Sequence, residues 1–264
     1  LHDYQSDGYF RLIRNFQRYG WLVPYLFGAS PAVCRSFLQG RPHRFEDFDD
    51  CTLYAPYATS LRMSDIGYKN KAQAGLAVSY DSLDAYVDSL TRAIETPAPE
   101  YAARGGTGDG EWRQLNANVL QIENEFYSFI RPKNIVRSGE KPSLALRRRG
   151  VEYVEIRALD VNAYSPLGVD EPQLRFITAL LVFCLLEDSP VVTADEQAEI
   201  DHNQAQVALR GREPGLHLRH RGREIALKDW GLALLEPLAA IAEVLDAADG
   251  SDRYRAAVAA QREA

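Results

Sequence analysis

The amino-acid sequence predicts an α+β fold, with extended segments in the middle of the chain and helices in its second half. Residues 150–161 alternate as a β-strand does, and residues 114–126 carry β-compatible side chains before the chain turns polar. Residues 170–264 consist almost entirely of helical patterns. The chain has 264 residues, 46% of them hydrophobic and 25% charged, which is an ordinary globular composition that suffices for one sizeable core.

Charge and cysteine content exclude several classes of protein. The net charge of -7 argues against a protein that binds the phosphate backbone of nucleic acid, and Arg147–Arg149 is the only compact basic run. Cys34, Cys51 and Cys184 form no CxxC pair, so we expect neither a disulfide scaffold nor a structural zinc site. The apolar stretches are too short to span a bilayer. We therefore expect a cytoplasmic protein that binds neither nucleic acid nor membranes.

The first third of the chain contains helical and irregular patterns. Apolar residues at near-helical spacing predict a helix over residues 8–22. Gly28 then breaks the pattern, and a new helix is expected to begin at Pro31. Residues 40–60 lack periodicity, so we expect a long loop that leads into a short extended piece.

The middle third has one clear helix and two loops. An apolar stripe predicts a helix from Ser82 to Ile94, with Asp81 as its cap. The glycine-rich stretch 103–111 fits no phosphate-binding fingerprint, so we interpret it as a loop. Residues 131–145 are interpreted as a long polar connection between the two extended segments.

The last third contains the strongest helix signals. Asp170, followed by Pro172 and Gln173, has the pattern of a capped helix start, and the helix is expected to run to Leu186. The patterns predict further helices over the following ranges: Ala194–Leu209, Lys228–Ala248 with Pro237 kinking or splitting it, and Asp252–Ala264.

The strand at residues 150–161 carries the first candidate chemistry. Alternation places Glu155 and Arg157 on one face, opposite Val154 and Ile156. A carboxylate and a guanidinium on one face are costly to bury unless ions or a substrate compensate them. The alternative is a solvent-exposed face with a salt bridge, and spacing alone favours that alternative.

Two further clusters hold candidate binding residues. Residues 57–68 combine hydroxyl groups with Arg62 and Tyr68, side chains suited to gripping a carboxylate and lining a small pocket; the alternative is a turn with a surface arginine. Residues 119–127, which include Asn124 and Tyr127, precede a basic segment that could meet phosphates. The alternative there is a polar strand end followed by a surface loop.

Six segments together resemble the proteobacterial glutamate–cysteine ligase family, in the order in which that family has them. They are Tyr25-Leu26-Phe27-Gly28-Ala29-Ser30-Pro31-Ala32, Tyr57-Ala58-Thr59-Ser60-Leu61-Arg62, Asp65-Ile66-Gly67-Tyr68, Leu120-Gln121-Ile122-Glu123-Asn124-Glu125, Ile130-Arg131-Pro132-Lys133 and Ser165-Pro166-Leu167-Gly168-Val169-Asp170-Glu171.

The resemblance implies a glutamine-synthetase-like carboxylate–amine ligase fold, a partial antiparallel sheet with helices packed outside it. It implies a cytoplasmic enzyme that uses ATP and Mg²⁺ to join the γ-carboxylate of L-glutamate to the amine of L-cysteine through a γ-glutamyl phosphate, the first step of glutathione synthesis. Residues 1–264 would be part of the catalytic domain, with residues 170–264 as its mainly helical portion. The oligomeric state is not predicted.

The resemblance also implies roles for individual residues. Glu155 matches a magnesium-binding carboxylate, and Arg157 matches the side chain that stabilises the transferring phosphoryl group. Arg62 matches a residue that binds a substrate carboxylate. Three further positions match walls of the cysteine pocket: Tyr68, Asn124 and Tyr127. With these roles, the charged face of the strand is interpreted as one that looks onto metals and phosphates.

One departure from the family affects the expected activity. Most of the family's metal-binding acids and a substrate-side histidine lie upstream of the position that matches residue 1. We therefore expect the 264-residue chain alone to have little or no ligase activity. Two alternatives are another carboxylate–amine ligase of the same superfamily and a truncated, non-catalytic product.

Overall fold

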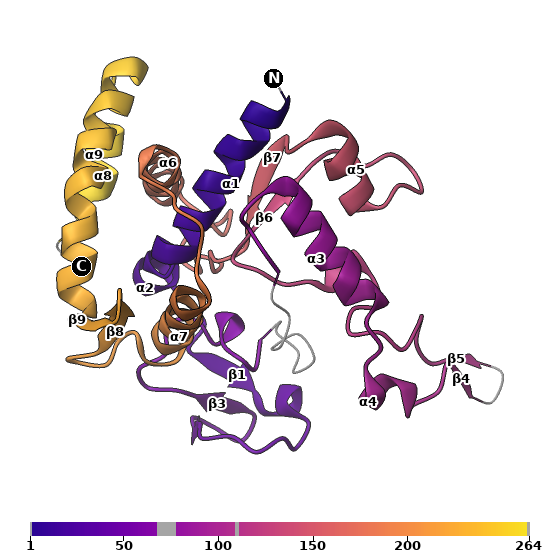
Figure 1. The fold of residues 1–264 in the computed structure, drawn as a ribbon. Helices are drawn as coiled ribbons and strands as arrows, with labels where there is room; N and C mark the ends of the chain where they lie inside the picture. Colours follow the sequence, from indigo (N-terminus) through magenta and orange to yellow (C-terminus); the bar gives the residue numbers. More distant parts are fainter. Residues whose placement is uncertain (1, 68–77, 109–110, 263–264) are drawn as a thin grey trace. The chain divides into compact units, whose positions relative to one another are not determined.

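The computed structural model describes residues 2–67, 78–108 and 111–262, which fold into two compact units (Figure 1). One unit comprises Leu1–Arg14 and Lys69–Arg157, and the other comprises Asn15–Tyr68 and Ala158–Ala264. The first helix, α1 (His2–Tyr19), therefore contributes residues to both units. Each unit has its own core and its own small antiparallel sheets.

The first unit places two helices beside a strand pair. The helices α3 and α5 pack against each other, and the strands β6 and β7 form an antiparallel pair. Its elements are α3 (Leu83–Glu95), α4 (Pro99–Ala102), β4 (Thr107–Gly108), β5 (Glu111–Trp112), the 3-10 helix η4 (Glu123–Glu125), β6 (Ile130–Lys133), α5 (Pro142–Arg149) and β7 (Tyr153–Ile156).

The core of the first unit is aromatic. Phe10 and Tyr80 lie against the buried ring of Tyr86, with ring centroids 5.8 and 5.4 Å from it. Phe129 and Ile130, at the start of β6, are also fully buried. The strand pair is therefore fixed to the core at one end by apolar packing.

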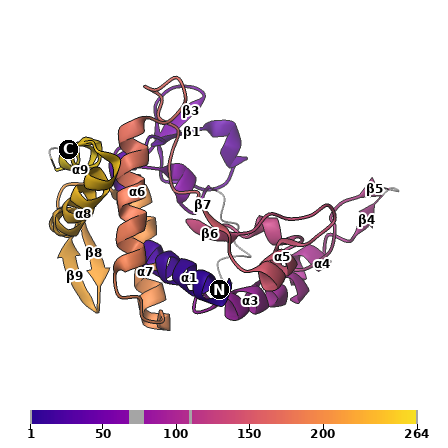
Figure 2. The same ribbon diagram turned by 90° about the horizontal axis from the view of Figure 1, so that it is seen from above.

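The second unit is dominated by helices. Figure 2 shows α8 and α9 running beside α6, and these three helices contact one another. The elements are α2 (Leu22–Phe27), β1 (Ala32–Cys34), the 3-10 helix η1 (Arg35–Leu38), β2 (Glu46–Asp47), β3 (Thr52–Tyr54), the 3-10 helix η2 (Leu61–Met63), α6 (Glu171–Leu186), α7 (Ala194–Arg210), β8 (His217–His220), β9 (Arg223–Ala226), α8 (Leu227–Asp249) and α9 (Arg253–Ala260).

The structure confirms the α+β prediction. All strands paired in sheets are antiparallel among the described residues, in the orders β1-β3-β2, β4-β5, β6-β7 and β8-β9. The helix predicted from Asp170 is α6, and its capping box of Asp170 and Gln173 is present. None of the helices described in residues 2–262 has the length and apolar character that crossing a bilayer requires.

Several predictions about local structure are wrong. No helix begins at Pro31, because residues 32–34 form β1 and pair with β3. Ser82 rather than Asp81 caps α3, since the Ser82 hydroxyl accepts from the Ala85 amide at 3.2 Å. Pro237 does not split α8, which continues through it as one element.

The predicted extended segment 114–126 forms no strand, and its regular features are η4 and an isolated antiparallel bridge between Asn118 and Pro97. Its polar side chains bond its own backbone instead of a neighbouring strand: Gln121 accepts from the Leu115 amide at 2.7 Å, and Glu125 accepts from the Gln121 amide at 2.8 Å. Local bonds of this kind compete with strand pairing. Conversely, the predicted loop 131–145 contains most of β6 and the start of α5, because β6 pairs with β7 and Pro142 begins a helix.

Candidate active site

The strand pair β6–β7 brings four polar side chains onto one face of the first unit. Arg131 pairs with Glu155 in the antiparallel register, and Lys133 pairs with Tyr153. Side chains two residues apart share a face of a strand, so these four point to the same side. Arg157 follows β7 with the same alternation.

Glu155 lies beside a lysine on this face. Its Oε2 atom is 3.3 Å from the ammonium nitrogen of Lys133, with 40% of the Glu155 side chain and 23% of the Lys133 side chain exposed. The Oε2 atom itself is buried and accepts no hydrogen bond from any described residue. The contact between Glu155 and Lys133 is therefore an ion pair without a hydrogen bond, and the Oε2 atom can still accept one.

Glu155 fits one ligand of a magnesium ion. Magnesium takes oxygen ligands, with one or two carboxylates and substrate phosphates among them, and a buried carboxylate oxygen without a hydrogen bond suits that role. No group of three or more His, Cys, Asp or Glu residues that could hold a metal occurs in residues 2–67, 78–108 and 111–262. The described residues therefore fit one contribution to such a site.

Arg157 and Tyr127 hold each other in place. The guanidinium carbon of Arg157 lies 4.7 Å from the centroid of the Tyr127 ring, and the Tyr127 hydroxyl donates to the Arg157 carbonyl at 3.3 Å. Tyr127 is 7% exposed. The backbone amide of Arg157 also donates to the Phe129 carbonyl at 2.9 Å, which extends the strand pairing past β7. The buried Tyr127 ring therefore fixes the position of the Arg157 guanidinium.

Asn124 lies in η4 and is linked to the strand pair through its backbone. Its carbonyl accepts from Nη1 of Arg131 at 3.4 Å, while its side chain is exposed. Arg131 is only 6% exposed, and its Nε atom has no hydrogen-bond partner among the described residues. A buried guanidinium with an unused donor is costly, so this face of the unit carries polar groups that are only partly satisfied.

Tyr86 lies beneath these charges. Burial, together with the neighbouring carboxylates of Glu123 and Glu155, raises the pKa of Tyr86 to about 12. The Arg131 guanidinium, which shares a hydrogen bond with the Tyr86 hydroxyl, offsets part of the rise. Tyr86 is therefore neutral at physiological pH and serves as a hydrogen-bonding group in the core.

Arg62 belongs to the second unit, where it is held by a buried carboxylate. Its Nε donates to Oδ1 of Asp160 at 2.8 Å, and its Nη2 donates to the Leu159 carbonyl at 2.9 Å. Asp160 is almost fully buried and also accepts from the Ala29 amide and the Ser30 hydroxyl, at 2.9 and 2.7 Å. The orientation of Arg62 is thus set by at least two bonds.

The structure brings together four of the six predicted site residues in one unit: Asn124, Tyr127, Glu155 and Arg157. Arg62 lies in the other unit, and Tyr68 lies outside the described residues. The sequence indicates Arg131 and Lys133 only as part of a basic segment that could meet phosphates, and it does not single out Asp160. Arg131 and Lys133 are two residues apart, so they share a face if the segment is a strand. The sequence alone did not indicate that β6 is a strand.

Comparisons with solved structures place this fold among ligases. A glutamate–cysteine ligase from Francisella tularensis, solved in complex with AMP, superposes with a TM-score of 0.89 at 39% identity and matches 98% of this chain and 51% of its own. A bifunctional glutathione synthetase from Pasteurella multocida shares the fold, with a TM-score of 0.68 at 24% identity over 98% of this chain and 28% of its own.

The chain belongs to the glutamate–cysteine ligase family, whose profile matches residues 2–207. It is 55% identical to a glutamate–cysteine ligase of Pseudomonas paraeruginosa and 54% identical to one of Azotobacter vinelandii, over 98% and 99% of this chain. The predicted family resemblance is confirmed. The chain spans about half the length of the curated relatives it matches, 49% in both cases.

Proposed function

We propose that this chain supplies part of the active site of an enzyme that joins the γ-carboxylate of L-glutamate to the amine of L-cysteine with the hydrolysis of ATP to ADP and phosphate. Family membership at 55% identity over 98% of the chain carries the proposal. The AMP in the Francisella tularensis relative supports a nucleotide as one reactant. The two unsatisfied buried atoms on the β6–β7 face, Arg131 Nε and Glu155 Oε2, support a face that meets further polar groups.

The reaction has two steps. A γ-carboxylate oxygen of glutamate first takes the terminal phosphoryl group of ATP, which releases ADP and gives an acyl phosphate. The cysteine nitrogen then attacks the acyl carbon, phosphate leaves, and the nitrogen loses a proton. Positioning and charge stabilisation supply most of the rate in reactions of this kind.

Arg157 is the residue that we assign to the transferring phosphoryl group. A guanidinium has a planar set of donors that matches phosphate oxygens. Its position over the Tyr127 ring fixes the guanidinium and limits the loss of side-chain entropy on binding. We therefore assign Arg157 the stabilisation of charge that develops during phosphoryl transfer.

Glu155 is assigned to magnesium, which neutralises phosphate charge when it is bound. Within this chain, Glu155 would contribute one carboxylate oxygen, and Lys133 would keep that side of the face balanced in charge. The remaining ligands would come from groups outside the described residues. It follows that the 264-residue chain alone would bind Mg²⁺ weakly and turn over little substrate.

Tyr127 and Asn124 are assigned to the wall of the pocket that accepts cysteine, and Arg62 is assigned to a substrate carboxylate. For Tyr68, which lies outside the described residues, the assignment to cysteine binding rests on the family resemblance alone. Two of the Arg62 nitrogens already donate within the protein, so its guanidinium would meet the carboxylate in a preset orientation. We further propose that the enzyme acts in the cytoplasm, where ATP is available and thiols such as the three unpaired cysteines stay reduced.

A chimera tests this function directly. This chain would replace the segment that it matches in the Pseudomonas paraeruginosa ligase, so that the rest of that enzyme supplies everything else. We expect ADP release that requires both glutamate and cysteine, with γ-glutamylcysteine as the product. The isolated chain, assayed beside it, is expected to release little or no ADP.

A panel of amine acceptors separates the alternatives. Release of ADP with an amine other than cysteine, but not with cysteine, would assign the chain to another carboxylate–amine ligase. A chimera that is folded yet inactive with every acceptor, while the intact relative turns over, would indicate a non-catalytic chain.

A further inference from the structure

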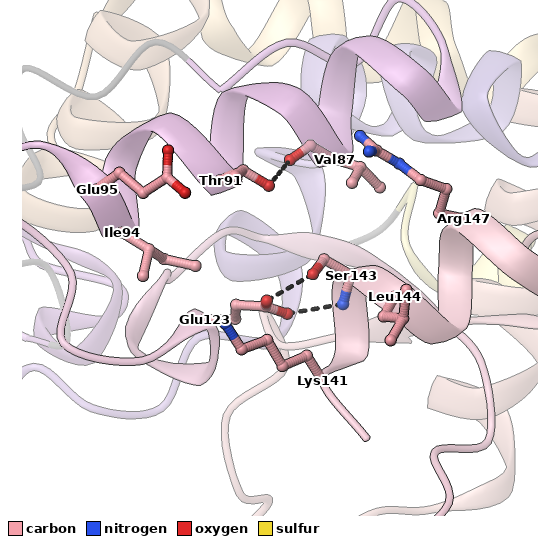
Figure 3. A pocket seen from close by; sticks show the side chains of 9 residues that line it. All are labelled: Val87, Thr91, Ile94, Glu95, Glu123, Lys141, Ser143, Leu144 and Arg147. Atoms are coloured by element: carbon pink, nitrogen blue, oxygen red, sulfur yellow. Dashed lines mark hydrogen bonds between the residues drawn. The ribbon is translucent and has the colours of Figure 1, made fainter. Parts of the chain in front are cut away.

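Glu123 has a buried carboxylate, and both of its oxygens accept hydrogen bonds from the same residue, Ser143. Its Oε2 accepts from the Ser143 amide at 2.7 Å, and its Oε1 accepts from the Ser143 hydroxyl at 2.5 Å (Figure 3). Glu123 is 7% exposed and Ser143 is 8% exposed. A buried carboxylate held by two short hydrogen bonds is rigidly placed.

This bond satisfies the first turn of α5. The residue before the helix, Lys141, makes no side-chain cap, and Pro142 has no amide hydrogen to donate. The amide of Ser143 is thus the first free donor of the helix, and a residue 20 positions earlier satisfies it. The negative charge of Glu123 also lies at the positive end of the α5 dipole.

Glu123 begins the segment that carries the proposed cysteine-pocket wall. The Phe126 amide donates back to the Glu123 carbonyl at 3.2 Å, which closes the single turn of η4. Asn124 follows Glu123 and is held through its carbonyl by Arg131. Tyr127 ends the segment against Arg157. The segment 123–127 is therefore anchored at its start by α5 and at its end by Arg157.

The side chain of Glu123 points toward Ser143 at the start of α5 (Figure 3). It lines a pocket of about 260 Å³ whose other walls are formed by residues of α3, α5 and Lys141 (Figure 3). The bond to Ser143 therefore ties η4 to the first turn of α5.

We propose that Glu123 is a positioning residue for the amine-accepting side of the site. It acts through the Ser143 bond, which fixes η4 and hence Asn124 and Tyr127. This proposal rests on the proposed function, since it assumes that those two residues contact the amine acceptor.

Variants of Glu123 and of Ser143, each made in the chimera, test this proposal. Glu123→Gln keeps the volume and removes the charge, and Ser143→Ala removes the hydroxyl bond. We expect each to raise the KM for cysteine, by about tenfold for Glu123→Gln, with the KM for ATP changed by less than about twofold. The double variant should resemble Glu123→Gln, because both changes break the same contact.

A matched control removes a contact to Arg147, which lines the same pocket. Asp88 of α3 pairs with Arg147 of α5, so Asp88→Asn removes a charged contact between the same two helices without touching η4. We expect it to leave the KM for cysteine unchanged. An unchanged cysteine KM in both Glu123→Gln and Ser143→Ala would overturn the proposal, as would equal rises in the KM for cysteine and ATP. If Glu123→Gln does not fold, Ser143→Ala decides.

Hydrogen exchange of the 264-residue chain gives a readout that needs no activity. The amides of residues 124–127 and of Ser143 should exchange faster in Glu123→Gln and keep their protection in Asp88→Asn. Unaltered exchange in Glu123→Gln would contradict the anchoring role. If the unmodified chimera shows no cysteine-dependent turnover, the proposed function is wrong, and the positioning role of Glu123 is wrong with it. If the chimera is active but hydrogen exchange is unaltered in Glu123→Gln, only the positioning role of Glu123 is wrong.

Discussion

The guanidinium of Arg157 lies over the ring of Tyr127, with 4.7 Å between the guanidinium carbon and the ring centroid, and the Tyr127 hydroxyl bonds the carbonyl of the same arginine. One residue thus fixes both the side chain and the backbone of the other. This arrangement joins the proposed phosphoryl-binding residue to the proposed acceptor pocket, so a change in either should affect both steps of the reaction.

Arg157→Met should lower kcat of the chimera about 10²- to 10³-fold, because it removes a positioned donor from charge that develops in the transition state. ADP release under saturating substrates measures the effect. Arg148→Met, which removes an exposed arginine of α5, serves as the control and should retain activity. A kcat within the range of that control would remove Arg157 from its assigned role.

Glu155→Gln should raise the Mg²⁺ concentration needed for half-maximal activity by about 10- to 100-fold, as loss of a ligand or of its orientation does in other metal sites. Glu152→Gln is the matched control, because Glu152 directly precedes β7, lies three residues from Glu155 and is exposed. Binding of Mn²⁺ by the chimera, followed by its paramagnetic signal, gives a second measurement. Equal Mn²⁺ affinity in both variants would argue against Glu155 as a ligand.

Asp160→Ala should destabilise the second unit by about 2–4 kcal/mol, because the change leaves several donors without their shared acceptor. This loss of stability is smaller than the loss expected on breaking a fully buried ion pair, because a quarter of the Arg62 side chain is exposed. Urea unfolding of the 264-residue chain measures it. The exposed pair of Glu236 and Arg262 is the comparison, and Glu236→Gln should cost less than about 1 kcal/mol.

Acidification should weaken the chain partly through Glu140. The bonds from Arg149, at 2.7 and 2.9 Å, and from the Arg137 amide lower the pKa of Glu140 from 4.5 to about 2. A folded-state pKa below the unfolded value means that this contribution to stability is present above pH 4.5 and is lost as the pH falls toward 2. Urea midpoints of Glu140→Gln and the unmodified chain should therefore converge on acidification. A constant difference between the two at all pH values would show that the charge of Glu140 plays no part.

Thiol labelling should distinguish the exposed Cys34 from the buried Cys184. Burial raises the pKa of Cys184 strongly, whereas hydrogen bonds from Ser36 lower the pKa of the exposed Cys34. Because the thiolate is the reactive form, the exposed Cys34 should react with iodoacetamide at pH 7 in the native chain, and Cys184 only after unfolding. Peptide mass spectrometry reports each site. Rapid labelling of Cys184 in the native chain would contradict the packing of α6.

Local signals in the sequence predicted the elements whose causes are local. The capping box at Asp170 and Gln173 contains its own start signal, so α6 was predicted from the correct residue. Glu155 and Arg157 were placed on one face by the alternation of β7 alone. The strand β6 was missed because it has four residues and contains Pro132, which a two-stranded ribbon tolerates at its edge.

Contacts between distant residues could not be predicted in this way. Glu123 and Ser143 are 20 residues apart, and Asp160 accepts from Ala29 across 131 residues. Nothing in the sequence near either acid indicates its partner. The family resemblance implies roles for the residues that are proposed to meet substrates, but not for the buried groups that hold them.

Transfer of oxygen from glutamate to phosphate tests the central claim most directly. The chimera would be given L-glutamate with ¹⁸O in both γ-carboxylate oxygens, together with ATP and L-cysteine. If this chain completes a ligase that forms a γ-glutamyl phosphate, the phosphate released in each turnover carries one ¹⁸O atom, and γ-glutamylcysteine retains the other. Unlabelled phosphate, or no cysteine-dependent phosphate release from a folded chimera, would contradict the account.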